Sequence, residues 1–198
     1  MRRVTLRALC VLAAVASGYA LGGEPQLISP AAVALCPPIQ APDEDWSIYG
    51  LRLNIGYGEH REVFGVDTGV AGGVTERLQG LQVNFLVNYD QGDSQALQIA
   101  GLFNYNAGTF HGLAIAGLVN LAQDSKEALG IQIAFIANVA TTASALQIGA
   151  VNVAAKNMEG VQIGVVNYAR ELSGVQIGVI NISPDGPIEF MPVLNFAF

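Results

Sequence analysis

The stretch GVQIGVVNYARELSGVQIGVINI, residues 160–182, contains one short motif twice, and this motif decides the fold. Each copy places a Gln between two aliphatic residues and follows it with Gly, further aliphatic residues and an Asn. The alternation of apolar with polar or small residues has the period of a β-strand and not of a helix. Because the motif returns after a short connection, the segment predicts strands built from a repeated unit.

The same motif extends over most of the chain. We take the polar residue at the centre of each copy as its reference position, which gives ten units of about 15 residues within residues 46–198. The reference residues are Arg52, Asp67, Gln82, Gln98, Ala114, Gln132, Gln147, Gln162, Gln176 and Glu189. Residues 46–198 are therefore expected to form one repeat-built β domain.

Splitting each unit by parity separates the two faces of the predicted strands. Side chains at odd distances from the reference position are mostly Leu, Ile and Val, with aromatic residues near strand ends, whereas even distances carry Gln, Asn, Gly and Ala. One face of each strand is therefore apolar and the other is small and polar. In the last units the spacing from Gln to Asn is one residue shorter, and the pattern accounts for this only by a bulge.

The fold that this pattern favours is a ten-stranded transmembrane β-barrel. Strands of about 10 residues cross a bilayer when tilted, with apolar side chains toward lipid and aromatic belts at both interfaces. A narrow interior would then be filled by the polar row Gln82, Gln98, Gln132, Gln147, Gln162 and Gln176. The alternation of Leu194, Phe196 and Phe198 at the end of the chain resembles the C-terminal assembly signal of outer-membrane barrels.

Three charged reference residues support closure of such a barrel. A closed barrel pairs its last strand with its first, so Glu189, Arg52 and Asp67 would point inward from adjacent strands, where either acid could neutralise the arginine. The alternative is a β-solenoid, in which each unit is one coil, Leu and Ile stack inside, and Gln and Asn form ladders on the surface. The near-identity of the units favours such stacking, and a mean hydropathy of +0.42 is high for a barrel with a wet lumen.

The N-terminal region predicts export. Residues 1–22 have a basic start, a short apolar run and small residues at the end, as a cleavable signal peptide has. Residues 23–45 are rich in Pro, end in acids and are expected to form a flexible leader. After cleavage Cys36 is the only thiol, so no intrachain disulfide is expected. We expect a location in the outer membrane or at the cell surface, with outer-membrane lipid and the barrel-assembly machinery as partners.

Composition and motifs argue against several classes of function. Sixteen acidic residues outnumber nine basic ones, and the net charge of −7 disfavours binding to nucleic acid. The sequence holds no metal, nucleophile-elbow or phosphate-loop motif, so neither a cofactor nor enzymatic activity is expected. His60, beside Glu59, and His111 are expected to be turn residues, and an acid/base site at the rim is the alternative. The Asp-Thr-Gly around Asp67 lacks the second triplet of an aspartic protease.

The repeats GLQVNFLVN, GVQIGVVNYA and GVQIGVINI, the opening YGLRLNIGYGEHREVFGVDTG and the ending PVLNFAF resemble a family of bacterial surface-repeat-containing proteins. The likeness covers residues 49–198. It implies a cell-envelope protein without an assigned activity and supplies no catalytic residues. We therefore expect a structural barrel of the outer membrane or cell surface with a narrow or filled interior. The alternative is a secreted or surface-displayed solenoid that serves as a binding or adhesion module.

Overall fold

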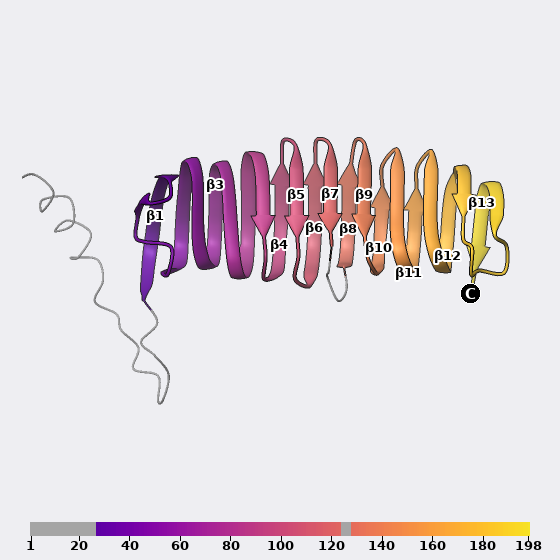
Figure 1. Cartoon of the computed structure of the whole chain (residues 1–198), viewed down its shortest axis with the longest axis horizontal. Coiled ribbons are helices and arrows are strands. Elements are labelled where there is room, and N and C mark those ends of the chain that lie inside the picture. Colours follow the sequence, from indigo (N-terminus) through magenta and orange to yellow (C-terminus); the bar gives the residue numbers. More distant parts are fainter. Residues whose placement is uncertain (1–26, 124–127) are drawn as a thin grey trace, which may run out of the picture.

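The computed structural model describes residues 27–123 and 128–198, which form a β-solenoid of about nine turns. Figure 1 shows the coils stacked along one axis, with β1 at one end and β13 at the other. The predicted barrel is therefore wrong, and the alternative architecture is the one that the chain adopts. No part of the described chain forms a helix that could cross a membrane. The predicted signal peptide, residues 1–22, lies outside the described residues.

Each coil contributes to two parallel sheets. The strands are β1 (Ile28–Cys36), β2 (Ile39–Ala41), β3 (Ser47–Asp90), β4 (Asp93–Ala100), β5 (Phe103–Asn106), β6 (Phe110–Ala116), β7 (Val119–Ala122), β8 (Ala128–Ala134), β9 (Ala137–Ala140), β10 (Ala143–Ile148), β11 (Val151–Ile163), β12 (Val166–Ile182) and β13 (Phe190–Ala197). Sheet A stacks residues 77–84 of β3, then β4, β6, β8, β10 and the C-terminal parts of β11 and β12. Sheet B stacks residues 87–90 of β3, then β5, β7, β9 and the N-terminal parts of β11 and β12.

Neighbouring coils pair in parallel and in register, so each residue lies beside its equivalent in the next unit. Gln147 pairs with Gln132 on one side and with Gln162 on the other. One repeat is therefore a coil bent into two strands, such as β4 and β5, and not one long strand that crosses a membrane. In a barrel and in a solenoid alike, successive side chains of a strand point to opposite faces. The alternation of apolar and polar residues therefore cannot distinguish the two folds.

The structure confirms that alternate side chains of each strand point to opposite faces. The faces are exchanged, however, relative to those of the solenoid expected from the sequence. Gln and Asn point inward and are buried, whereas many of the Leu, Ile and Val side chains are exposed on the outside. The expected solenoid had aliphatic residues inside and amide ladders on its surface, so that part of the alternative is wrong. The rest of the interior of the later coils is apolar and includes Ala128, Ala143, Met158 and Leu172.

The shorter Gln-to-Asn spacing of the last units is absorbed where the coil bends. β4 ends two residues after Gln98, whereas β10 ends one residue after Gln147, and a two-residue bend follows each strand. Asn152 therefore still pairs in register with Asn138 and points inward. The shorter spacing would turn the Asn of the last units outward if the strand were straight, but the bend keeps it inward. No bulge between Gln and Asn is therefore needed.

The Gly that precedes the aliphatic residue of the motif has a steric role. Gly160 has φ +122°, a conformation that residues with a side chain rarely adopt, and a Cβ there would meet the carbonyl oxygen of Ala145 in the preceding coil. Gly174 repeats this arrangement one coil later, with φ +150°. The close approach of successive coils thus selects Gly at this position.

Strands that leave the repeat close both ends of the stack. β1 runs parallel to the start of β3, and β2 folds back antiparallel onto β1. Residues 28–41, which the sequence assigned to a flexible leader, therefore belong to the folded domain. At the other end β13 pairs antiparallel with β12. The tenth predicted unit is thus not a coil, and its Glu189 is exposed beside β13 instead of lying inward next to Arg52.

Candidate functional site

An unbroken ladder of asparagine side chains runs through the core along sheet B. Each Asn except the last donates from Nδ2 to Oδ1 of the Asn in the next coil, at 2.7–2.9 Å, and to the carbonyl that follows the reference residue of that coil. The last Asn donates to the carbonyls of Gly178 and Met191 instead. The members are Asn88, Asn104, Asn120, Asn138, Asn152, Asn167 and Asn181. Because every rung both donates and accepts, the ladder ties the coils together and joins the two sheets.

The glutamines form a second ladder, which runs in the opposite sense. Each Gln donates from Nε2 to Oε1 of the Gln in the preceding coil, in two segments: Gln82 with Gln98 at 3.2 Å, and Gln132, Gln147, Gln162 and Gln176 at 2.8 Å. Ala114 separates the segments. Asn195 of β13 donates to Oε1 of Gln176 at 3.3 Å, so the last strand closes the ladder. The structure thus places the whole predicted polar row in the core.

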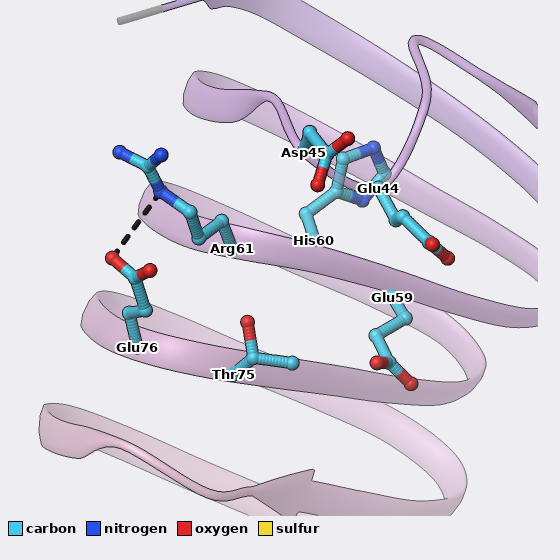
Figure 2. A pocket seen from close by; sticks show the side chains of 7 residues that line it. All are labelled: Glu44, Asp45, Glu59, His60, Arg61, Thr75 and Glu76. Carbon is cyan, nitrogen blue, oxygen red and sulfur yellow. Dashed lines mark ion pairs between the residues drawn. The ribbon is translucent and has the colours of Figure 1, made fainter. Parts of the chain in front are cut away.

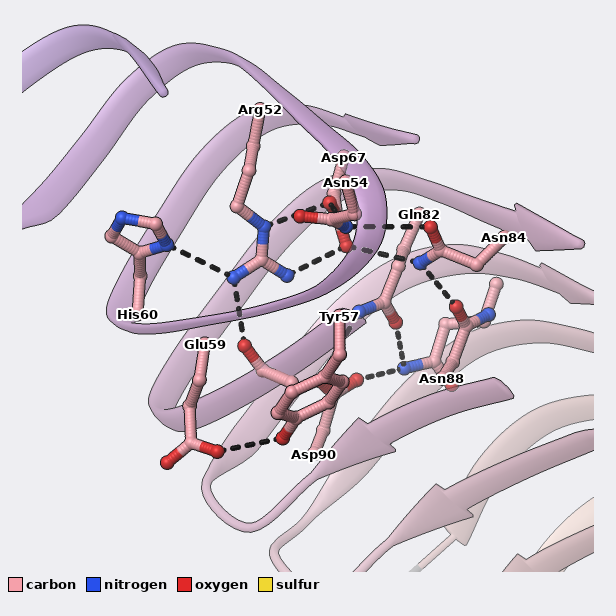
Figure 3. A network of polar contacts seen from close by, with 12 residues as sticks. Arg52, Asn54, Tyr57, Glu59, His60, Asp67, Gln82, Asn84, Asn88 and Asp90 are labelled. Carbon is pink, nitrogen blue, oxygen red and sulfur yellow. Dashed lines mark hydrogen bonds and ion pairs between the residues drawn. The ribbon is translucent and has the colours of Figure 1, made fainter. Parts of the chain in front are cut away.

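A charged cluster lies at the N-terminal end of this amide core (Figure 3). Arg52 is fully buried, and its Nε and Nη2 donate to the two carboxylate oxygens of Asp67 at 2.8 and 2.7 Å. Its Nη1 donates to the carbonyl oxygen of Gly73 at 2.7 Å. Asn54 and Asn84 also donate to Asp67, at 2.7 and 3.2 Å. Two members of the predicted triad thus lie together, and the guanidinium has its partners without Glu189.

The protonation state of Asp67 follows from these contacts. Burial by itself raises the pKa of a carboxyl, but the hydrogen bonds and the positive charge of Arg52 outweigh burial, and the pKa of Asp67 lies below its ordinary value. The pair is therefore ionised and hydrogen-bonded within a closed core. Both carboxylate oxygens and all three guanidinium nitrogens of the pair are thus engaged in hydrogen bonds within the core.

His60 is a core residue that the sequence placed in a turn. Its Nδ1 lies 3.5 Å from Nη1 of Arg52, and its Nε2 lies 3.3 Å from the carbonyl oxygen of Pro42. Burial and the charge of Arg52 lower the pKa of His60 to about 4. The ring is thus neutral at neutral pH, with Nε2–H donating to Pro42 and Nδ1 facing the guanidinium.

Asp90 is a second buried acid that sequence reasoning missed. It accepts hydrogen bonds from Gln82 at 3.3 Å, from Ser94 at 3.4 Å, and from Gln98. Burial raises the pKa of Asp90 to about 7. A signal was present in the sequence, because Asp90 stands at an even distance from Gln82 and the parity rule directs it inward.

A hollow at the N-terminal rim marks the place of the alternative acid/base site (Figure 2). It is lined by Glu44, Asp45, Glu59, His60, Arg61, Thr75 and Glu76. Both ring nitrogens of His60 face the partners described above, and Glu59 accepts a hydrogen bond from the hydroxyl of Tyr57 at 2.6 Å. Arg61 lies 3.2 Å from Glu76. The rim therefore presents no imidazole nitrogen to a substrate.

The second histidine and the metal-ligating residues give no further site. His111 lies in β6 beside Gln95 and Leu129 of the adjacent strands, neither of which titrates. Within residues 27–123 and 128–198, no three His, Cys, Asp or Glu side chains gather where they could hold a metal ion.

The outer surface is divided into an apolar and a charged zone. In the coils with reference residues from Arg52 to Gln176, the positions directly before and after the reference residue carry Leu, Val or Ile, with Thr68 as the exception. We call the bend from sheet A to sheet B the apolar corner, and its most exposed residues are Ile55, Phe85, Phe135, Ile136, Val165 and Val179. We call the opposite turns the charged corner, which carries Glu76, Arg77, Asp93, Lys156, Arg170 and Glu171.

Tyrosines lie between these zones on sheet B. Tyr89, Tyr105 and Tyr168 each directly follow an Asn of the ladder and so occupy the outer row nearest the charged corner. The rings of Tyr89 and Tyr105 stack with centroids 4.9 Å apart and planes 12° apart. The matching row of sheet A is mainly polar and includes Gln95 and Glu159.

The C-terminal residues that were predicted to be an assembly signal continue the outer apolar rows. Leu194 and Phe196 are exposed on β13, where they pair with Ile177 and Val175 of β12, and Phe198 follows the strand with 97% of its surface exposed. Their interpretation as a signal rested on the barrel and does not extend to this fold. Comparisons of the chain with family models, with curated proteins and with solved structures give no match.

Proposed function

We propose that this chain is a non-enzymatic binding module displayed at the cell surface, and that it engages its partner through the apolar corner and the aliphatic rows beside it. The observation that carries this proposal is the reversed distribution of side chains, with amides buried and aliphatic and aromatic residues exposed. Monomeric soluble proteins rarely expose contiguous apolar patches above a few hundred Å². Here such rows continue along about nine turns.

The buried groups are poorly suited to binding or catalysis. The Asn and Gln side chains bond to one another inside the coils, so they form no flat amide face for a glycan or a protein. Arg52 and Asp67 bind each other in the core, and both ring nitrogens of His60 face partners there. The predicted signal peptide and the resemblance to surface-repeat proteins support display at the cell surface.

A substitution at the apolar corner tests this function. Replacing Phe85, Phe135 and Val165 together by Ser removes exposed apolar area without touching the core. Burial of a Phe side chain contributes about 1.5–3 kcal/mol, so we expect retention on a phenyl-derivatised matrix to fall roughly tenfold or more for each Phe. Recovery of the chain with cell membranes should fall in parallel.

The matched control replaces three residues of the charged corner, Arg77, Lys156 and Glu171, by Ser. This variant should keep the retention and the membrane recovery of the original chain, and circular dichroism should show strand content unchanged in both variants. Equal retention of the corner variant and the original chain would remove the apolar corner as the binding surface.

A further inference from the structure

We infer that the partner is one leaflet of a lipid bilayer and that the apolar corner inserts into it. The long axis of the solenoid then lies parallel to the membrane plane. This inference rests on the proposed function and names the partner of the same surface. Four features of the structure carry it: the depth of the apolar zone, the order of its aromatic residues, the pairing of its backbone and its convex shape.

The depth of the apolar zone matches one leaflet. Along sheet A the apolar zone extends from the corner residue Phe135 to Ile131, which precedes the reference Gln. At about 3.3 Å per residue this is about 13 Å. The hydrocarbon core of a bilayer is about 30 Å thick, so one leaflet supplies about 15 Å. The next outer row, with Gln95 and Glu159, is mainly polar, so the apolar surface ends where the leaflet ends.

The aromatic residues are ordered as in proteins that lie in a membrane interface. Phe85 and Phe135, at the tip of the apolar corner, are 74% and 81% exposed, and they have no polar atom that would require water. Tyr89, Tyr105 and Tyr168 lie in the row nearest the charged corner. Tyr prefers the headgroup level, where its ring contacts acyl chains and its hydroxyl reaches polar groups. Immersion of the corner places both residue types at their preferred depth.

The backbone of the apolar corner is paired along the solenoid axis. The amide of Leu102 donates to the carbonyl of Leu86 at 2.9 Å, and that of Leu118 donates to Leu102 at 3.0 Å. Ile136 continues the series by donating to Leu118 at 3.0 Å. Irregular backbone is normally excluded from lipid because unpaired polar groups there cost several kcal/mol each. In the bends of this solenoid, these amides and carbonyls are paired from coil to coil.

The shape of the apolar surface favours lipid over a second copy of the chain. The surface continues from sheet A around the corner onto sheet B, so it is convex. A second solenoid laid against one flat sheet leaves the other sheet uncovered, whereas acyl chains conform to both. The net charge of −7 disfavours anionic headgroups, so the leaflet is expected to be zwitterionic at the contact.

Fluorescence quenching in vesicles measures the depth of the corner directly. Trp46 is the only tryptophan, so Trp46→Phe gives a chain without tryptophan emission. In this background Phe135→Trp places a reporter at the corner, and Gln95→Trp places a matched reporter on the polar row of sheet A. Phosphatidylcholine vesicles are prepared with bromine either near the carbonyl end or near the methyl end of one acyl chain. We expect Phe135→Trp to lose more emission to bromine near the methyl end, and Gln95→Trp to lose none.

The remaining measurements separate this inference from the proposed function. Phe85→Ser and Phe135→Ser should each lower partition into phosphatidylcholine vesicles roughly tenfold, while Gln79→Ser leaves it unchanged. Retention on the phenyl matrix that depends on the corner, without quenching or vesicle partition, would overturn the lipid inference and leave the proposed function standing. A concentration-dependent dimer in sedimentation, lost on Phe135→Ser, would assign the surface to a second copy instead. Retention that does not depend on the corner would overturn both.

Discussion

At the scale of single residues, the core is held together by polar side chains that satisfy one another. The buried Arg52–Asp67 pair occupies two reference positions that later coils fill with Gln. Burying two ions carries a desolvation penalty of several kcal/mol per ion, which their bidentate contact and the added amide bonds offset. The pair is therefore stable only while both partners are present.

A single substitution in this pair should therefore lower stability, and substitution of both residues should restore most of it. Arg52→Gln alone leaves the carboxylate of Asp67 buried without its partner and should destabilise the chain by about 3–5 kcal/mol. The double variant Arg52→Gln with Asp67→Gln extends the glutamine ladder from Gln82 by two rungs and should regain most of that loss. Denaturant midpoints measured by circular dichroism give the comparison. A double variant no more stable than the single one would show that the first coils cannot accept the ladder.

Asp90 predicts a dependence of stability on pH. Its pKa of about 7 in the folded chain lies above the ordinary value of 3.8, so folding takes up a proton at this carboxyl. The stabilisation is therefore complete below pH 3.8 and is lost as the pH rises through about 7. Relative to Asp90→Asn, the denaturation midpoint of the original chain should therefore fall between about pH 4 and pH 7 and change little above about pH 8.

His60 contributes a pH dependence of stability with the opposite sign. Its folded pKa of about 4 lies below the ordinary 6.5, so its contribution is complete above pH 6.5 and is lost as the pH falls through about 4. Comparing the original chain with Asp90→Asn at each pH cancels this common effect. An identical pH dependence in both chains between about pH 4 and pH 7 would assign it to another group.

At the scale of the strands, each coil depends on its neighbours through the asparagine ladder. Asn138 accepts from Asn120, donates to Asn152 and donates to the carbonyl of Ile148, each at 2.9 Å. Asn138→Ala removes all three bonds and leaves buried polar groups without partners, at about 1–3 kcal/mol for each group. We expect a loss of about 2–5 kcal/mol in the free energy of unfolding.

The exposed Asn157 in β11 offers the matched control. Asn157→Ala removes the same atoms from a solvated position and should change stability by less than about 0.5 kcal/mol. Thermal or denaturant unfolding of both variants, followed by circular dichroism, measures the difference. Similar small losses in the two variants would show that the ladder adds little to the stability of the stack.

The elements also show which parts of the fold the sequence could predict. Parity directed Gln132 and its equivalents inward, because the alternation of a strand is local. The choice between barrel and solenoid depends on which strands become neighbours, and alternation contains no information on that. One physical argument does separate them: Gln147 and Gln132 can bond as rungs only if adjacent strands are parallel and in register. The buried His60 was missed because its partners Arg52 and Pro42 come from other parts of the chain.

At the scale of the whole molecule, the chain is a linear array in which each coil contacts only the coils beside it. Such an array continues until something ends it, because each terminal coil presents unpaired backbone groups. β13 ends it here by pairing antiparallel with β12 and by donating Asn195 to Gln176. At the other end, β1 and β2 perform the same role for the first coil.

Removal of the C-terminal strand should therefore produce end-to-end assemblies. A chain ending at residue 186 lacks β13, so the edge of β12 and the side-chain oxygen of Gln176 lose their partners. Sedimentation in mild detergent should show species that grow with protein concentration, whereas a chain lacking only Phe198, which lies beyond β13, should sediment like the original. If the chain ending at residue 186 stays monomeric with its strand content intact, then β12 needs no cap and the array must be limited by the exposed residues along its sides.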